Sequence, residues 1–158
     1  MRTELLVYKT LFDGEEENEV PEELMPALER IRKDEGTIRD YLDIADRYRE
    51  IERPDKEFAA LELALDLGHD DLVFYHLARN RAGQGQYAEA YQYITRMHSM
   101  HGMAKLLYLK ILGELGKAEK LNQFWQTNKS DSELKQLIKQ EGLDHFPKNV
   151  RKLLREDF

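Results

Sequence analysis

The sequence predicts an all-helical protein built from paired helices, and three observations lead to this prediction. The 158 residues include only four prolines and nine glycines, so few positions interrupt a helix. Between about residues 37 and 128, apolar residues recur at spacings of three and four, which places them on one face of a helix. The chain also resembles itself at a period of about thirty residues, which is typical of helical repeat proteins.

The first 36 residues are predicted to form an N-terminal segment that precedes the repeats. Residues 13–23 are acidic and contain a proline, which indicates a solvated loop. A lead-in helix is expected to follow from about Glu22 to Lys33. Residues 1–36 are therefore treated as one segment, made of an acidic loop and this helix.

Residues 37–128 are predicted to form three helix pairs. Three segments align with one another, at residues 41–48, 71–78 and 102–109. Each segment leads to a turn, at residues 54–55, 83–85 and 113–116. A second helix is expected after each turn, with Ala60 and Ala90 at matching positions and Leu121 in the third copy.

The middle copy resembles a tetratricopeptide (TPR) repeat. The matching positions are Phe74, Leu77, Ala78, Gly85, Tyr87, Ala90 and Ile94. Ala78 and Ala90 allow two helices to approach closely, and Gly85 is suited to end the first helix. The sequence departs from the family at Arg81, where Tyr is usual, and at Gly102, where Pro is common. The resemblance implies a TPR-like helical-hairpin solenoid, a right-handed superhelix of antiparallel helix pairs with helical caps; the alternative is an unrelated helical bundle.

Residues 129–158 are predicted to cap this array with two helices, as the ends of repeat arrays require. Residues 130–133 have the pattern of a capping box, and Pro147 suits the first turn of a last helix. The basic residues of that helix are Lys148, Arg151, Lys152 and Arg155. We interpret them as a solvated face; a basic amphipathic helix for a membrane or nucleic acid is the alternative.

Composition restricts the function. The chain has 31 acidic and 24 basic residues and a net charge of -7, which argues against a general attraction to nucleic acid or anionic membrane. Because there is no cysteine, disulfides, thiolate metal sites and cysteine nucleophiles are excluded. No apolar stretch approaches the length of a membrane span, so a cytoplasmic location is expected.

The TPR resemblance implies that the first helix of each pair lines a concave groove where a partner lies. The residues predicted to bind that partner are Arg49, Tyr75, Arg79, Met103, Leu106 and Lys110. Arg and Tyr in such a groove suit a peptide with carboxylates and apolar anchors. The alternative is that these are ordinary surface residues paired with neighbours such as Glu52 and Glu114. A further hypothesis is that residues 13–19 fold back into the groove and compete with the partner.

No catalytic motif is recognisable, and Gly83-Gln84-Gly85 lacks the Lys and Ser/Thr of a phosphate loop. Asp70 or Asp71 is best explained as a helix N-cap. His98 and His101, among three methionines, could hold a soft metal, but exposed or capping histidines explain them more simply.

The sequence thus predicts a non-enzymatic adaptor that binds another protein, without a cofactor or metal. A structural homo-oligomer that uses its end caps or Phe124, a fixed subunit of a complex, and a ligand- or metal-binding protein are the alternatives.

Overall fold

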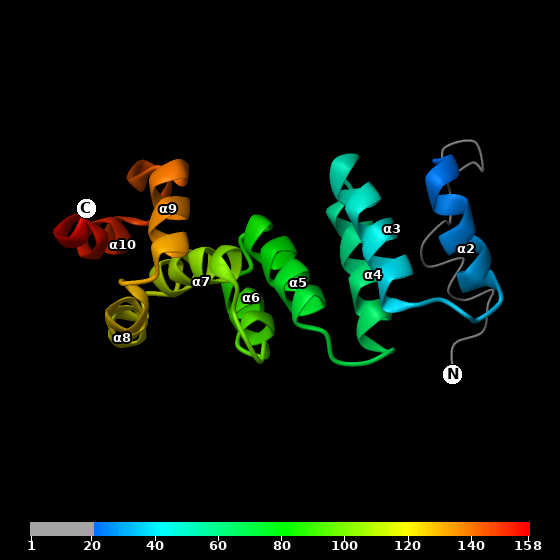
Figure 1. Cartoon of the computed structure of the whole chain (residues 1–158), viewed down its shortest axis with the longest axis horizontal. Helices are drawn as coiled ribbons and strands as arrows, with labels where there is room; N and C mark the ends of the chain where they lie inside the picture. The colour runs from blue at the N-terminus through cyan, green and yellow to red at the C-terminus, as the bar shows by residue number, and fades with distance from the viewer. Residues whose placement is uncertain (1–20) are drawn as a thin grey trace. The chain divides into compact units, whose positions relative to one another are not determined.

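The computed structural model describes residues 21–158, and helices are the only regular secondary structure in that range. The prediction of an all-helical protein is confirmed for these residues (Figure 1). None of the helices within residues 21–158 has both the length and the apolar character needed to cross a bilayer. The chain divides into two compact units, of which one ends at Asn80 and the other runs from Arg81 to Phe158.

In the described part of the first unit, the first helix is the predicted lead-in helix. A single 3-10 turn, η2 (Glu22–Leu24), leads into α2 (Met25–Arg32). Ala27, Leu28 and Ile31 are buried on one face of α2, and α2 packs against α3 (Ile38–Glu50). The lead-in helix therefore covers part of the first helix pair.

The first helix pair consists of α3 and α4 (Pro54–Leu65), which lie side by side as a hairpin (Figure 1). Thr37 and Asp40 form a capping box at the start of α3. Pro54 is the first residue of α4, where its fixed φ suits a helix and its missing N–H costs nothing. The sequence had suggested a turn at residues 54–55, but both residues belong to α4, and the turn lies just before them.

The remaining helices follow the order that the sequence predicts. They are α5 (Asp71–Gly83), α6 (Tyr87–Ile94), α7 (Gly102–Glu114), α8 (Ala118–Asn128), α9 (Ser132–Glu141), η3 (Leu143–His145), α10 (Lys148–Leu154) and η4 (Arg155–Asp157). The helix α5 begins in the first unit and ends in the second. The small residues singled out by the TPR resemblance, Ala60, Ala78 and Ala90, are fully buried.

The turns after α3, α5 and α7 share one backbone conformation. Glu52, Gly85 and Gly116 have φ angles of 58°, 75° and 65°, in the left-handed region. In each turn the N–H of the next residue donates to a carbonyl five residues earlier: Arg53 to Tyr48 at 2.8 Å, Gln86 to Arg81 at 2.9 Å and Lys117 to Leu112 at 3.0 Å. This is the Schellman type of helix end. The turns after the first helix of each pair are therefore equivalent in structure, and the first of them lies at Glu52, before the predicted residues 54–55.

The core of the second unit surrounds Trp125, which is fully buried. Leu109, Leu112, Leu134, Ile138, Val150 and Leu154 belong to the same apolar cluster. The Trp125 indole N–H donates to Asp157 Oδ2 at 2.7 Å, and its ring stacks on Phe158, so Trp125 packs against the C-terminal end. The predicted capping box at residues 130–133 is replaced by a simpler cap, in which the Asp131 carboxylate accepts from the N–H of Leu134.

Candidate functional site

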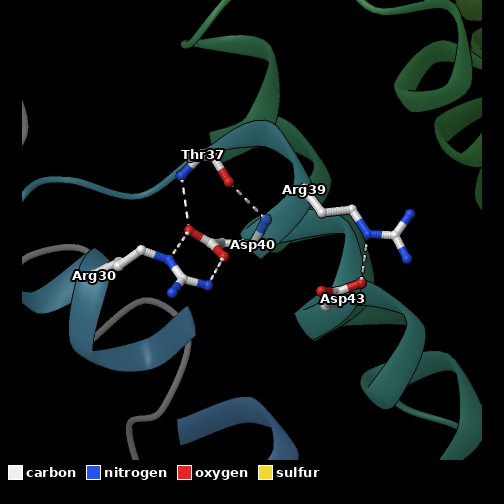
Figure 2. Close-up of polar contacts among 5 residues, drawn as sticks. All are labelled: Arg30, Thr37, Arg39, Asp40 and Asp43. Carbon is white, nitrogen blue, oxygen red and sulfur yellow. Dashed lines mark hydrogen bonds and ion pairs between the residues drawn. The ribbon is translucent and has the colours of Figure 1, made fainter. Parts of the chain in front are cut away.

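A buried carboxylate joins α2 to α3 (Figure 2). Asp40 is 2% exposed, and Arg30 donates to it twice, from Nε at 3.0 Å and from Nη2 at 2.6 Å. The backbone N–H of Thr37 donates to the same carboxylate at 2.9 Å. The hydrogen bonds from Arg30 hold the pKa of Asp40 below its usual value, although burial opposes this shift. Because every contact is internal, this network has a structural role.

The predicted partner-binding residues of the first unit lie in different environments. Arg49 is exposed and makes no ion pair with another described residue. Tyr75 is only 7% exposed, and the Arg79 guanidinium lies 5.5 Å from the centre of its ring. Arg79 Nη2 also donates to His76 Nδ1 at 2.6 Å and lies 3.8 Å from Glu57 Oε2. Arg79 is thus held in place by its neighbours, whereas Arg49 is open to solvent.

Next to Arg79 lies a buried polar pair that was not predicted from the sequence. Glu57 and Asn80 are each 5% exposed, and Asn80 Nδ2 donates to Glu57 Oε1 at 2.6 Å and to the Pro54 carbonyl at 3.0 Å. The signal was present in the helix period. Glu57 lies on the same face of α4 as the buried Ala60 and Leu61, at a spacing of three and four residues. A polar residue in such a stripe indicates a buried, hydrogen-bonded group.

In the second unit, α9 packs against α7 and covers two of the predicted partner-binding residues. Leu106 is 4% exposed and lies in the apolar cluster with residues of α9. Lys110 forms an ion pair with Glu141 at the end of α9 and lies 5.4 Å from the ring centre of Phe146. Met103, by contrast, is 45% exposed. The structure therefore leaves Met103 as the accessible apolar residue of the three.

A second ion pair fixes the other end of α9. Lys105 Nζ donates to Asp131 Oδ2 at 2.7 Å, and this hydrogen bond holds the pKa of Asp131 below its usual value. Asp131 is also the N-cap of α9. The two lysines of α7, Lys105 and Lys110, thus contact opposite ends of the neighbouring helix.

Large apolar residues are exposed at the same position of two successive first helices. Leu72 is the second residue of α5 and is 40% exposed, and Met103 is the second residue of α7. Each is followed seven residues later by a cation, Arg79 in α5 and Lys110 in α7. The second residue of α3 is Arg39, which is exposed but charged. An exposed apolar residue followed by a cation therefore recurs in the second and third pairs.

The second unit also carries an aromatic cluster with two lysines. The Tyr91 and Tyr108 rings stack at 6.2 Å, and Phe124 meets Tyr108 edge-on at 4.9 Å. Lys120 donates to the Tyr91 hydroxyl at 2.7 Å, which lowers the pKa of Tyr91, and Lys117 lies 4.9 Å from the same ring centre. Burial raises the pKa of Tyr108 to about 12. Phe124, which the sequence offered as an exposed contact residue, is thus partly covered by the protein itself.

The histidines considered as metal ligands, His98 and His101, lie in the segment that leads into α7. The Nδ1 atom of His101 accepts from the N–H of Ala104 at 3.2 Å, so His101 is the N-cap of this helix, and His98 is exposed. The acidic segment of residues 13–19, which was considered as a competitor for the groove, lies outside the described residues.

A comparison of the chain with protein-family models, with curated proteins and with solved structures finds no match.

Proposed function

We propose that the protein is a non-enzymatic interaction module of the TPR type, which binds a peptide segment of a partner protein. The recurrence of one turn conformation after the first helix of each pair supports a repeat architecture. The buried alanines at the positions of the TPR pattern support the same view, since small residues there let paired helices approach closely. The concave groove of the TPR family is then the place where the partner lies.

The observation that carries the proposal is the exposure of Leu72 and Met103 at matching helix positions. Each of the two units thus exposes one apolar residue that is suited to contact an apolar side chain of a peptide. The nearby cations Arg49, Arg79 and Lys110 favour a peptide that also carries carboxylates. An acidic, partly apolar segment is therefore the expected ligand.

A substitution that tests the proposal must leave the internal contacts of the protein intact. Arg79→Glu would place a second carboxylate beside the buried Glu57, so a loss of binding could reflect unfolding. Leu72→Ser combined with Met103→Ser removes two exposed side chains and disturbs no described polar contact. Its matched control is Ile51→Ser combined with Leu67→Ser, since these residues are 42% and 50% exposed and lie outside the predicted groove.

The experiment is a selection of peptides from a random display library on the wild-type protein, followed by measurement of the affinities of the selected peptides. We expect enrichment of peptides that contain Asp or Glu together with Leu, Ile or Phe. The Leu72/Met103 variant should bind them at least about tenfold more weakly, and the Ile51/Leu67 control should retain wild-type affinity. Equal binding by both variants would show that the binding site does not include the exposed residues of the first helices. If the selected peptides contain no acidic residues, the inference that Arg49, Arg79 and Lys110 favour carboxylates is wrong.

A further inference from the structure

The basic residues of α10, together with Arg155 of η4, line an open hollow in the second unit. Its volume is about 690 Å³, and its lining residues are Gly113, Lys148, Asn149, Arg151, Lys152 and Arg155. Among residues 21–158, no carboxylate belongs to this lining. Pockets that hold small ligands have volumes of roughly 300 to 1,000 Å³, so the hollow is large enough for a compact molecule.

The four cations lie on one side of the helix because of their spacing. Lys148, Arg151, Lys152 and Arg155 follow one another at i, i+3, i+4 and i+7. Val150 and Leu154 occupy the opposite side and are fully buried in the core. Packing of that apolar side therefore directs the basic side outward into the hollow.

The backbone of α7 fixes α10 closely beneath the hollow. Gly113 has no side chain, and a Cβ atom at this position would clash with Val150. The Asn149 side chain donates from Nδ2 to the Gly113 carbonyl at 3.0 Å. The cations are thus attached to a helix whose position is set by direct contact, which lowers the cost of arranging them around a ligand.

These cations differ from four others in the described part of the chain, each of which is paired with a carboxylate. Arg30, Arg79, Lys105 and Lys110 each form an ion pair with an acidic residue. None of the four residues of the hollow forms an ion pair with an acidic residue among residues 21–158. The four cations around the hollow are therefore not held in ion pairs by described residues, and Glu156 and Asp157 follow them in the sequence without pairing with them.

We propose that this hollow binds a soluble ligand that bears two or more phosphate groups. Four positive charges match the charge of clustered phosphates better than that of a single carboxylate, and guanidinium groups bind phosphate oxygens through paired donors. The net charge of -7 opposes an extended polyanion or an anionic membrane, whereas a compact ligand meets mainly the local field of the hollow. This site is independent of the proposed peptide groove.

The test measures binding of tripolyphosphate to the full chain by calorimetry at low salt, with inorganic phosphate as the weaker, singly phosphorylated comparison. Lys148→Gln combined with Lys152→Gln removes two cations of the hollow. Lys135→Gln combined with Lys139→Gln in α9 is the matched control, because it changes net charge equally and lies outside the hollow. We expect the first variant to bind at least about tenfold more weakly and the control to change less than about twofold. Circular dichroism establishes that both variants are folded.

Further arms distinguish the source of the phosphates. Vesicles with anionic phospholipids and a single-stranded RNA are tested for binding to the wild type and for competition by tripolyphosphate. The proposal predicts that tripolyphosphate binds more tightly than either. Tighter binding to vesicles or RNA, equal weakening in both lysine variants, or no binding of tripolyphosphate would each overturn it.

Discussion

The equivalent turns after α3 and α5 predict that substitutions at matching positions change stability in opposite directions. Glu52 and Gly85 both follow a helix with φ in the left-handed region. A residue with a Cβ atom is strained in this region of φ, whereas glycine is not. We therefore expect Glu52→Gly to stabilise the protein and Gly85→Ala to destabilise it.

The magnitude follows from two opposing effects. A residue with a Cβ atom costs about 1 to 2 kcal/mol in the left-handed region, whereas glycine loses about 0.5 to 1 kcal/mol more conformational entropy on folding. No atom lies within 4 Å of a Cβ built at Gly85, so steric contact with neighbours adds nothing. Each substitution should thus change the free energy of unfolding by about 0.5 to 1 kcal/mol, which corresponds to about 1 to 4 °C in Tm.

The assay is urea unfolding followed by helical circular dichroism, with thermal unfolding as a second measure. Gly83→Ala is the control, since Gly83 is the last residue of α5, has ordinary helical backbone and also has no atom within 4 Å of its Cβ position. Alanine has the higher helix propensity, so this substitution should stabilise by up to about 1 kcal/mol. The reasoning fails if Gly85→Ala is as stable as Gly83→Ala, or if Glu52→Gly unfolds more easily than the wild type.

Three further predictions concern internal contacts. The pKa of Asp40 is lower in the folded protein than in the unfolded chain, where it is near 3.9. The ionised Asp40 therefore stabilises the fold above the unfolded-state pKa, and this stabilisation is lost as the pH falls through the folded-state pKa. Urea midpoints measured at decreasing pH should fall less steeply in Asp40→Asn than in the wild type. Gly113→Ala should destabilise by about 1 to 3 kcal/mol, because its Cβ meets Val150, and adding Val150→Ala should show favourable coupling in a double-mutant cycle. An ultraviolet titration of tyrosine should lose an early step in Tyr91→Phe and a step near pH 12 in Tyr108→Phe; unchanged titrations would contradict these assignments.

Helices and their ends could largely be predicted because their causes are local. The sequence predicts Asp70 or Asp71 as an N-cap, and it is the Asp70 carboxylate that accepts from the N–H groups of Leu72 and Val73, at 2.9 and 3.2 Å. The start of α9 was placed one residue too early. Ser130 and Asp131 are both good capping residues by type, and only the backbone path decides which oxygen reaches the N–H of Leu134.

The surroundings of the predicted partner-binding residues could not be predicted in the same way. Helix periodicity shows which residues share a face, but it does not show which other helix covers that face. Leu106 and Lys110 have the pattern of groove residues, yet α9 buries the first and pairs with the second. The partner of Lys110 is Glu141, which lies 31 residues away in the sequence. No local sequence pattern therefore predicts this ion pair.

The internal ion pairs change the argument about how a partner would bind. An acidic peptide that contacts Arg79 or Lys110 must compete with Glu57 or Glu141, which already occupy these cations. Charge in the proposed groove therefore contributes more to orientation and association rate than to net affinity. The exposed Leu72 side chain has no such competitor, and neither does that of Met103.

Apolar anchors must then supply most of the affinity for a peptide, since these side chains gain by leaving water. At α10 the situation is reversed, because no described carboxylate has to be displaced from the four cations. Salt should separate the two sites in one experiment: rising ionic strength should weaken binding of tripolyphosphate steeply and binding of a peptide only slightly. A peptide whose affinity falls as steeply as that of tripolyphosphate would show that charge dominates the groove as well, and the argument from internal ion pairs would then be wrong.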